Sequence, residues 1–229
     1  MTGDMESLKP LTQRPDNLTT MVYDSIRRAI ITRALPPGSR VSEARLAESL
    51  QVSKTPVREA LLRLMHAGLI VSDGRRGGLI AKPSAAALQA AYELREALEG
   101  QTARLAARNA ADDDLATIGR AAEQCLAGAL AGDLETFRAQ DKEFHLAVAA
   151  AAHSPYLRDA MADAYDLVWT LRLRDSPTAD TATSCAHDHT AILAAITASD
   201  DTRAGELMSA HVRKVATSVL GAMAVNPAT

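Results

Sequence analysis

The first third of the chain carries apolar residues at helical spacing in three short stretches, separated by turn residues. The stretches cover residues 18–34, 42–50 and 55–67. Pro36-Pro37-Gly38 ends the first stretch abruptly, and Gly68 ends the third. Ser42 is the expected N-cap of the second helix and Thr55 that of the third. This pattern predicts three short helices.

Two short apolar runs follow the third predicted helix. They are Leu69–Val71 and Leu79–Ala81, and they flank the glycine-rich, basic segment Asp73–Gly78. Short apolar runs on either side of such a segment predict a β-hairpin. Three helices followed by a hairpin form a winged helix-turn-helix, in which the third helix enters the major groove of DNA.

From residue 84 onward the apolar stripes keep helical spacing, and no strand pattern competes. The predicted helices cover residues 84–109, 112–131, 133–152, 155–174, 182–199 and 201–221. Alanine, the best helix former, occurs 7 times through Lys82 and 39 times in the remaining 147 residues. The expected fold class is mainly α, with an N-terminal winged helix-turn-helix followed by an all-α six-helix bundle.

This reading divides the chain into four parts. We expect a flexible N-terminal segment (1–17), a DNA-binding domain (18–83), a helical domain (84–221) and a tail (222–229). The charge divides in the same way. The formal net charge is −3, but 13 basic and 8 acidic residues through Pro83 give +5, and 12 basic and 20 acidic residues after it give −8. A basic module joined to an acidic one suits a nucleic-acid binder with a second function.

Several absences in the sequence narrow the class of protein. No apolar run approaches the length of a membrane span, and the polar start lacks a secretory apolar core, so we expect a cytoplasmic protein without a membrane partner. Cys125 and Cys185 are the only cysteines, which excludes a disulfide framework and a CxxC zinc motif.

Basic and small polar residues gather at the start of the third helix and at the hairpin tip. An arginine fork such as that of Arg58 matches guanine N7 and O6, whereas basic residues at the tip suit phosphates or a minor groove. The expected DNA contacts are Arg40, Lys54, Thr55, Arg58, Arg75, Arg76 and Gly77. The alternative is a solvated basic helix end and a charged hairpin that only keeps the protein soluble.

Two motifs in this region are family-specific. They are Pro36-Pro37-Gly38-Ser39-Arg40-Val41-Ser42-Glu43 and Val52-Ser53-Lys54-Thr55-Pro56-Val57-Arg58-Glu59-Ala60-Leu61. With them, the segment from about Leu18 to Pro83 resembles the winged-helix domain of GntR-family bacterial transcription regulators. The family usually carries arginine where this chain has Lys54, and lysine keeps the charge without the bidentate fork.

Four polar residues lie on apolar stripes of the second part. Asp141 and His145 are four residues apart on one predicted helix, whereas His189 and His211 lie on the last two. Burying them unpaired costs a few kcal/mol each, so something must satisfy them. A divalent metal ion satisfies all four together, and hydrogen-bonded core histidines are the alternative that the pattern leaves open.

The helical part also resembles a known family. Between about Ala85 and Val219 it is similar to the effector-binding and oligomerisation domain called FCD, found in the FadR subgroup of GntR regulators, and its six helices resemble the VanR-like branch. Many FCD domains carry Asp-x-x-x-His and two separate histidines as a metal site. The resemblance implies that Asp141, His145, His189 and His211 bind a divalent metal, with zinc as first choice and nickel, manganese or iron as alternatives.

The resemblance also implies an effector. The first bundle helix of the family commonly supplies an arginine, in a motif similar to Leu94-Arg95-Glu96-Ala97-Leu98-Glu99. An arginine fork can clamp a small carboxylate that also binds the metal. The candidates are Arg95, Arg172 and Arg174. For each of them a salt bridge at the surface or at a dimer interface is the alternative, and Glu96 and Glu99 are most simply solvated or paired.

The leading hypothesis is a homodimeric transcription regulator, a repressor by expectation and not an enzyme. It would bind a pseudo-palindromic operator in double-stranded DNA and respond to a small organic acid. A second hypothesis is a helical metalloenzyme acting on a small carboxylate, with a DNA-binding appendage. A third keeps the regulator and makes the metal purely structural.

Overall fold

The computed structural model describes residues 16–74, 76–172 and 178–225. Residues 1–15 of the expected N-terminal segment and residues 226–229 of the expected tail lie outside these ranges, as do the site candidates Arg75 and Arg174. The other residues of these two segments lie in the first and the last helix. The chain divides into two units, Met1–Ile80 and Ala81–Thr229. Each unit has its own core, and they are described separately.

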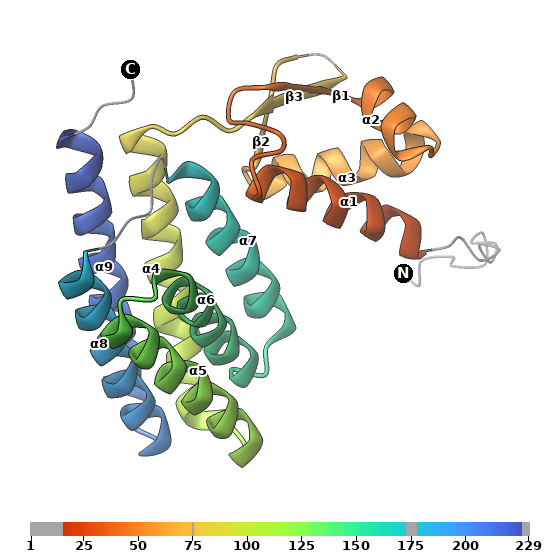
Figure 1. The fold of residues 1–229 in the computed structure, drawn as a ribbon. Coiled ribbons are helices and arrows are strands. Elements are labelled where there is room, and N and C mark those ends of the chain that lie inside the picture. The colour runs from red at the N-terminus through yellow and green to blue at the C-terminus, as the bar shows by residue number, and fades with distance from the viewer. Residues whose placement is uncertain (1–15, 75, 173–177, 226–229) are drawn as a thin grey trace, which may run out of the picture. The chain divides into compact units, whose positions relative to one another are not determined.

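In residues 16–74 and 76–80 the first unit contains three helices and three short strands (Figure 1). In chain order they are α1 (Asp16–Ile31), β1 (Arg40–Ser42), α2 (Glu43–Leu50), α3 (Lys54–His66), β2 (Ile70–Ser72) and β3 (Gly77–Ile80). Helices α1 and α3 pack against each other. Their shared core consists of the buried side chains of Val22, Ile26, Ile30, Val57, Leu61 and Leu64.

The strands form an antiparallel sheet in the order β1-β3-β2. The hairpin of β2 and β3 was expected from the sequence, but β1 was not. A strand of three residues directly before a helix gives too short an alternation of polar and apolar positions to be recognised. Its pairing of Val41 with Gly78 and of Ser42 with Gly77 ties the start of α2 to the wing.

The two cap predictions in this unit had different outcomes. Ser42 caps α2, since its side chain accepts a hydrogen bond from the backbone N–H of Arg45. The expectation for Thr55 is wrong, because α3 begins at Lys54 and Ser53 takes the cap position without a side-chain hydrogen bond. Pro56 is therefore the third helical residue rather than the first. It is still within the first turn, where the missing N–H breaks no helical hydrogen bond.

The second unit is a bundle of six helices in its described part. They are α4 (Ala85–Asn109), α5 (Asp112–Ala131), α6 (Leu134–Ala151), α7 (Pro155–Leu171), α8 (Ala179–Thr197) and α9 (Asp201–Val225). The fold class expected from the sequence, a winged helix-turn-helix followed by a six-helix bundle, is confirmed. None of the helices in the described ranges is both long enough and apolar enough to cross a membrane.

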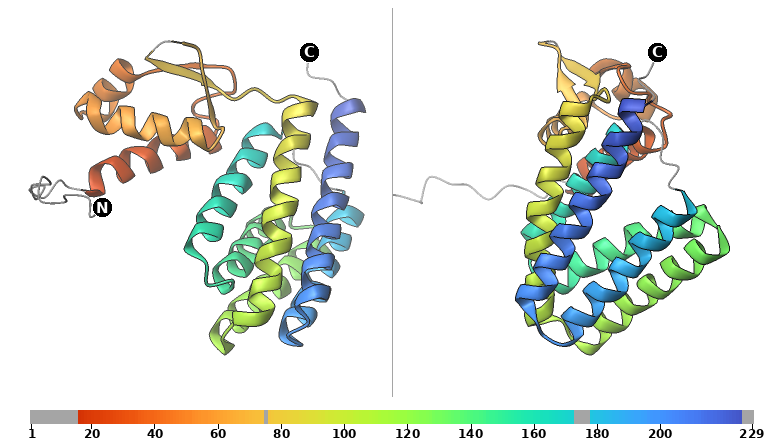
Figure 2. Two further views of the ribbon diagram at one scale, coloured as in Figure 1. Left: turned by 180° about the vertical axis from the view of Figure 1, so that it is seen from behind. Right: turned by 90° about the vertical axis from the view of Figure 1, so that its left-hand side faces the viewer.

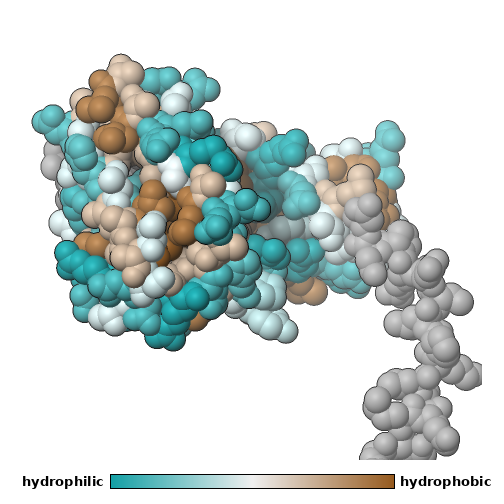
Figure 3. All heavy atoms as spheres, turned by 90° about the horizontal axis from the view of Figure 1, so that it is seen from below, coloured by the Kyte–Doolittle hydropathy of each residue, from teal (hydrophilic) through white to brown (hydrophobic). Residues whose placement is uncertain are grey.

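Helices α4 and α9 lie side by side along most of their length (Figure 2). Glycines permit this close approach: a Cβ at Gly100 would lie 2.4 Å from the Ser209 hydroxyl oxygen, and one at Gly205 would lie 2.5 Å from the Arg104 side chain. Helix α6 contacts α4, α5, α7 and α8, so residues on its buried face lie in the middle of the bundle. On the face of the bundle that Figure 3 shows, hydrophilic residues surround several separate apolar areas.

Gly128, in the last turn of α5, is also required for close packing, here against the start of α6. A Cβ at Gly128 would lie 2.8 Å from the backbone nitrogen of Phe137 and 3.2 Å from the carbonyl oxygen of Asp133. Neither atom can move without shifting α6. Gly128→Ala is therefore expected to lower the free energy of unfolding by about 1–3 kcal/mol, as other overpacked sites do. Urea denaturation followed by helical circular dichroism measures this change.

Gly119 provides the matched control on the same helix. A Cβ there would meet only the Leu193 side chain, at an ordinary contact distance of 3.8 Å. Gly119→Ala should be neutral or stabilise by up to about 1 kcal/mol, because alanine favours the helix. Equal effects of the two substitutions would contradict the packing argument.

Candidate metal centre

Three helices of the bundle bring four potential metal ligands together. Asp141 and His145 come from α6, His189 from α8 and His211 from α9. One ligand atom from each residue lies within 4.8 Å of the other three. The three imidazoles are buried, whereas Asp141 is partly exposed. The structure thus places the four predicted ligands in one cluster, with the imidazoles inside the bundle.

The nitrogens of His189 are the clearest sign that the cluster fits an ion. His189 is fully buried, and neither ring nitrogen has a hydrogen-bond partner among the described residues. Asp141 Oδ1 lies 3.6 Å from His189 Nε2 and 3.8 Å from His145 Nε2, which is too far for hydrogen bonds. Two ligand atoms bound to one ion at about 2.1 Å lie about 3–4 Å apart, so these separations suit a shared cation.

Two imidazoles are oriented by carboxylates on the side away from the cluster centre. His145 Nδ1 contacts Glu99 Oε2, and His211 Nδ1 lies 3.1 Å from Asp188 Oδ2. An imidazole that donates Nδ1–H to a carboxylate keeps the lone pair of Nε2 for a metal. A third contact orients Asp141, whose Oδ2 accepts a hydrogen bond from the Tyr165 hydroxyl at 2.9 Å.

These outer residues were not recognised from the sequence as part of the site. Glu99 was expected only to be solvated or paired, and it is paired, since its Oε1 lies 2.5 Å from Arg95 Nε. Asp188 directly precedes His189 in the chain but serves His211, which lies 23 residues further on. Two residues so far apart in the chain show no regular spacing from which their contact could be predicted. Only Glu99, one turn after the effector candidate Arg95, offered a local sign of its role.

Arg95 is deeply buried, and it contacts two residues, Glu99 and Tyr165, that themselves contact the metal-ligand cluster. It pairs with Glu99, and its guanidinium lies 4.6 Å from the centre of the Tyr165 ring. Burial alone raises the pKa of Glu99, but the charges of Arg95 and His145 outweigh it and lower the pKa to about 2. Glu99 is therefore ionised at neutral pH, as an orienting carboxylate must be.

The electrostatics of the cluster favour the forms that bind metal. Burial raises the pKa of Asp141, but the three histidines have the larger combined effect and lower it below its ordinary value. Burial lowers the pKa of His189 well below 6.5 and also lowers that of His211. At neutral pH burial thus favours neutral His189 and His211 beside an ionised Asp141, and a carboxylate with neutral imidazoles is the set that coordinates a divalent cation.

The remaining bundle candidates lie apart from the four ligands. Arg172 donates a hydrogen bond from Nε to the Tyr92 hydroxyl at 2.9 Å. His187 is exposed, and His153 contacts Asp114 at 2.8 Å, in agreement with their omission from the predicted ligand set. Glu96, the other acid of the arginine-containing motif, pairs with Arg213 at 2.6 Å.

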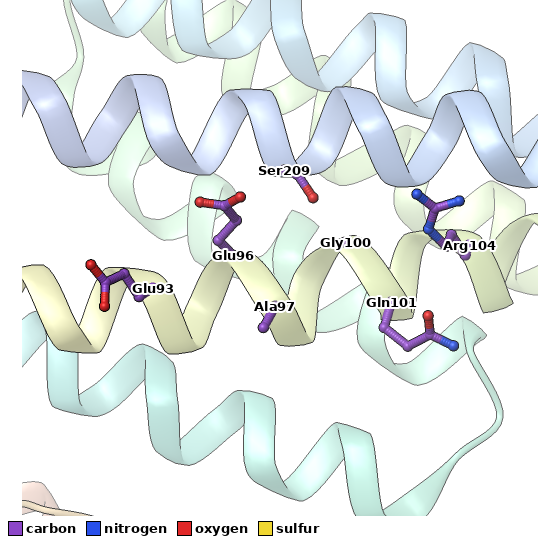
Figure 4. A pocket seen from close by; sticks show the side chains of 7 residues that line it. All are labelled: Glu93, Glu96, Ala97, Gly100, Gln101, Arg104 and Ser209. Carbon is purple, nitrogen blue, oxygen red and sulfur yellow. The ribbon is translucent and has the colours of Figure 1, made fainter.

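A hollow of about 400 Å³ lies on the face shared by α4 and α9 (Figure 4). It is lined by Glu93, Glu96, Ala97, Gly100, Gln101, Arg104 and Ser209. None of these is a predicted metal ligand or effector residue. The hollow and the metal-ligand cluster are therefore separate features of the bundle.

The predicted DNA-contact residues lie at the start of α3 and around the wing. Lys54, Thr55, Arg58 and Arg76 are exposed. Arg40 forms an ion pair with Asp73 at 2.9 Å, which links β1 to the β2–β3 turn.

Gly77 has a steric role in the sheet that the sequence did not indicate. It is buried, with φ at 135°, and a Cβ there would lie 2.2 Å from the carbonyl oxygen of Val41. Glycine is therefore required at this position for β3 to pair closely with β1.

Comparison with known protein families agrees with this architecture. Residues 18–80 match the family described as bacterial regulatory proteins, gntR family, and residues 90–214 match the FCD domain. These matches define a bacterial transcription regulator rather than an enzyme. The chain belongs to the GntR family and carries an FCD domain after its DNA-binding domain. The narrower placement in the FadR subgroup and the VanR-like branch stays a prediction.

Individual relatives support the same family. An HTH-type transcriptional regulator of Agrobacterium vitis is 34% identical over 64% of this chain and 91% of its own length. A protein of Paenarthrobacter nicotinovorans, whose name reads "Probable D-xylose utilization operon transcriptional repressor", is 31% identical over 85% of each chain. The solved structure of Escherichia coli McbR/YncC has the same fold, with a TM-score of 0.69 at 23% identity, covering 90% of this chain and 98% of that one.

Loss of His189 is expected to abolish stabilisation by metal. Addition of Zn²⁺, Ni²⁺ or Mn²⁺ to metal-free protein should raise the melting temperature, since an ion at 100 times its Kd stabilises the folded state by about 2.7 kcal/mol. His189→Ala should remove this shift, and His187→Ala, an exposed histidine on the same helix, should retain it. Differential scanning fluorimetry and metal analysis by mass spectrometry provide the measurements. An equal shift in both variants would exclude the cluster as the metal site.

The metal-free protein is expected to lose stability as the pH falls below 6.5. Below this value the unfolded chain protonates His189, whereas burial keeps it neutral in the folded state. The free energy of unfolding then falls by up to about 1.4 kcal/mol per pH unit for each such histidine. The buried carboxylates, whose folded pKa values are lowered, contribute stability that is lost only in the more acidic range.

Urea denaturation in the presence of a chelator, between pH 7.5 and 5.5, measures this dependence. The slope should be smaller for His189→Ala than for the wild type and unchanged for His187→Ala. Equal slopes in all three proteins would contradict the assignment of a buried, neutral His189.

Proposed function

We propose that this chain is an operator-binding repressor whose helical domain binds a divalent metal ion and a small organic acid that modulates DNA binding. The observation that carries the proposal is the convergence of three buried imidazoles and a carboxylate in the domain that follows the winged helix-turn-helix. Relatives named as repressors support repression rather than activation. We place the regulator in the cytoplasm, together with its DNA.

The proposed metal ligands are Asp141, His145, His189 and His211. Imidazole nitrogen and carboxylate oxygen suit zinc, which is our first choice, as well as nickel, manganese and iron. Bound here, the ion would supply a positive charge and open coordination positions to a carboxylate. Glu99, Asp188 and Tyr165 would orient the ligands, as outer contacts commonly do in metal sites.

The proposed effector contacts begin with Arg95. Its Nε is engaged by Glu99, which leaves the four Nη–H groups for further partners. Arg95 lies close to both Glu99 and Tyr165, which contact two of the proposed metal ligands. An acid bound to Arg95 would therefore act on the groups that orient the site. Arg172, hydrogen-bonded to Tyr92, is the second candidate, and Arg174 lies outside the described residues.

The proposed operator contacts follow from the exposed start of α3 and from the wing. Lys54, Thr55 and Arg58 would face the major groove, and Arg40 and Arg76 the DNA backbone. Arg75, at the wing tip, lies outside the described residues, and Gly77 would act through the sheet rather than through a side chain. Two copies in a homodimer would read a short pseudo-palindrome.

Regulation requires the effector to distinguish two states of the protein. The acid must bind the DNA-incompetent state more tightly, by about 5.5 kcal/mol for a switch from 1:99 to 99:1. Helix α6 is suited to transmit such a preference, because it carries two proposed ligands and contacts four other helices of the bundle.

The experiment that tests this function combines binding and DNA release. A duplex selected from a random library by the protein serves as the DNA probe, and sugar acids, hydroxy acids and dicarboxylates are titrated into metal-loaded and chelator-treated protein. At least one acid is expected to bind the metal-loaded form more tightly, by tenfold or more, and to release the duplex. Arg95→Gln should weaken acid binding, and Arg108→Gln, an exposed site on the same helix, should not.

Each part of the proposal has its own contradicting result. Failure to select any duplex sequence would exclude operator recognition. Equal affinity of the acids for metal-loaded and metal-free protein would make the ion purely structural.

A further inference from the structure

Arg58, the proposed guanine contact on α3, is held by an acidic side chain at the start of α2. Its Nε–H donates to Glu43 Oε2 at 3.0 Å, and its Nη2 donates to Glu43 Oε1 at 3.0 Å. These are two parallel hydrogen bonds along one edge of the guanidinium plane. The contact joins the two helices of the helix-turn-helix.

Glu43 is itself fixed in position. The residue is only 4% exposed although it carries a charge. It is the first residue of α2, directly after the cap Ser42, and its backbone N–H donates to the Arg76 carbonyl oxygen at 3.4 Å. The hydrogen bonds from Arg58 lower the pKa of Glu43, so the carboxylate stays ionised at neutral pH. One buried acid thus connects α2, α3 and the wing.

The contact leaves the second edge of the guanidinium group available. A guanidinium carries five N–H donors, and Glu43 takes two of them. The remaining three lie on Nη1 and on the outer side of Nη2, and two of these form the parallel pair that matches guanine N7 and O6. The Arg58 side chain is 58% exposed, whereas that of Glu43 is 6% exposed, so the available edge lies on the solvent side.

We infer that Glu43 is a positioning residue for sequence recognition, which fixes the guanidinium of Arg58 so that its available edge meets a guanine in the major groove. The inference rests on the proposed function, in which α3 enters that groove. An arginine that is already held loses less conformational freedom when it binds. A freely rotating arginine would reach nearby phosphates as readily as a base edge, and phosphate contacts carry no sequence information.

Charge alone predicts a different result for loss of Glu43. A carboxylate close to DNA repels phosphates, so its removal should strengthen binding to every sequence alike. Positioning predicts weaker discrimination at one base pair of each half-site. The two effects are therefore separated by a profile of binding against base substitution.

The test uses the full-length protein and a duplex that the wild type has selected from a random library. Each base pair is substituted in turn, and Kd is measured by fluorescence anisotropy. Arg58→Ala should lower discrimination at one guanine of each half-site by tenfold or more. Glu43→Gln, which keeps the side-chain volume, should lower discrimination at the same guanine by threefold or more, with Kd for a scrambled duplex unchanged or tighter.

Three further variants complete the design. Adding Glu43→Gln to Arg58→Ala should cause no additional loss, because Glu43 acts through Arg58. Glu48→Gln removes one negative charge from an exposed site on the same helix, so it should leave the profile unchanged. Glu43→Met, an apolar side chain of similar length, has the same expected result as Glu43→Gln and replaces it if that variant does not fold.

The outcomes separate this inference from the proposed function. An unchanged profile for Glu43→Gln, while Arg58→Ala loses its guanine, would overturn the inference alone. An equal loss at every base pair together with a lower melting temperature would also overturn it, because Glu43 would then be only structural. Selection of no sequence by the wild type, or no effect of Arg58→Ala on any guanine, would overturn both.

Discussion

The burial of three imidazoles among closely packed helices is the constraint on which the bundle depends. His145, His189 and His211 come from α6, α8 and α9, and each would cost a few kcal/mol if left unsatisfied. His211 Nδ1 lies 3.1 Å from Asp188 Oδ2 and His145 Nδ1 contacts Glu99 Oε2, whereas neither nitrogen of His189 has a hydrogen-bond partner among the described residues. The helices therefore meet around a centre whose polar atoms point at one another, and a cation between them would remove the largest remaining cost.

Much of this architecture could be predicted from the sequence, because it rests on local periodicity. The spacing of Asp141 and His145 places both on one face of a helix, and the apolar neighbours of His189 and His211 turn these residues inward. The outer contacts could not be predicted in the same way. The Glu99–His145 contact joins residues 46 positions apart, and which carboxylate meets which imidazole depends on the rotation of two packed helices. The strand β1 was missed because three residues carry too little pattern.

In the DNA-binding unit, residue type indicated the function but not the geometry. An arginine at the start of a recognition helix suggests a base contact, yet the sequence does not show that Glu43, 15 residues earlier, holds it. The missed strand is part of the reason: β1 pairs with β3 and brings the start of α2 against the wing. A short element that periodicity cannot detect thus determines how a functional side chain is presented.

Phe144 stacks on His189, with ring centroids 4.0 Å apart and planes only 14° from parallel. It is fully buried, so a hydrocarbon wall covers one face of the imidazole. A packed core opens rarely, so water does not reach the covered face of this ring while the helices stay together. Of the four proposed ligands only Asp141 is partly exposed. An ion would therefore enter and leave the centre past this carboxylate rather than past His189.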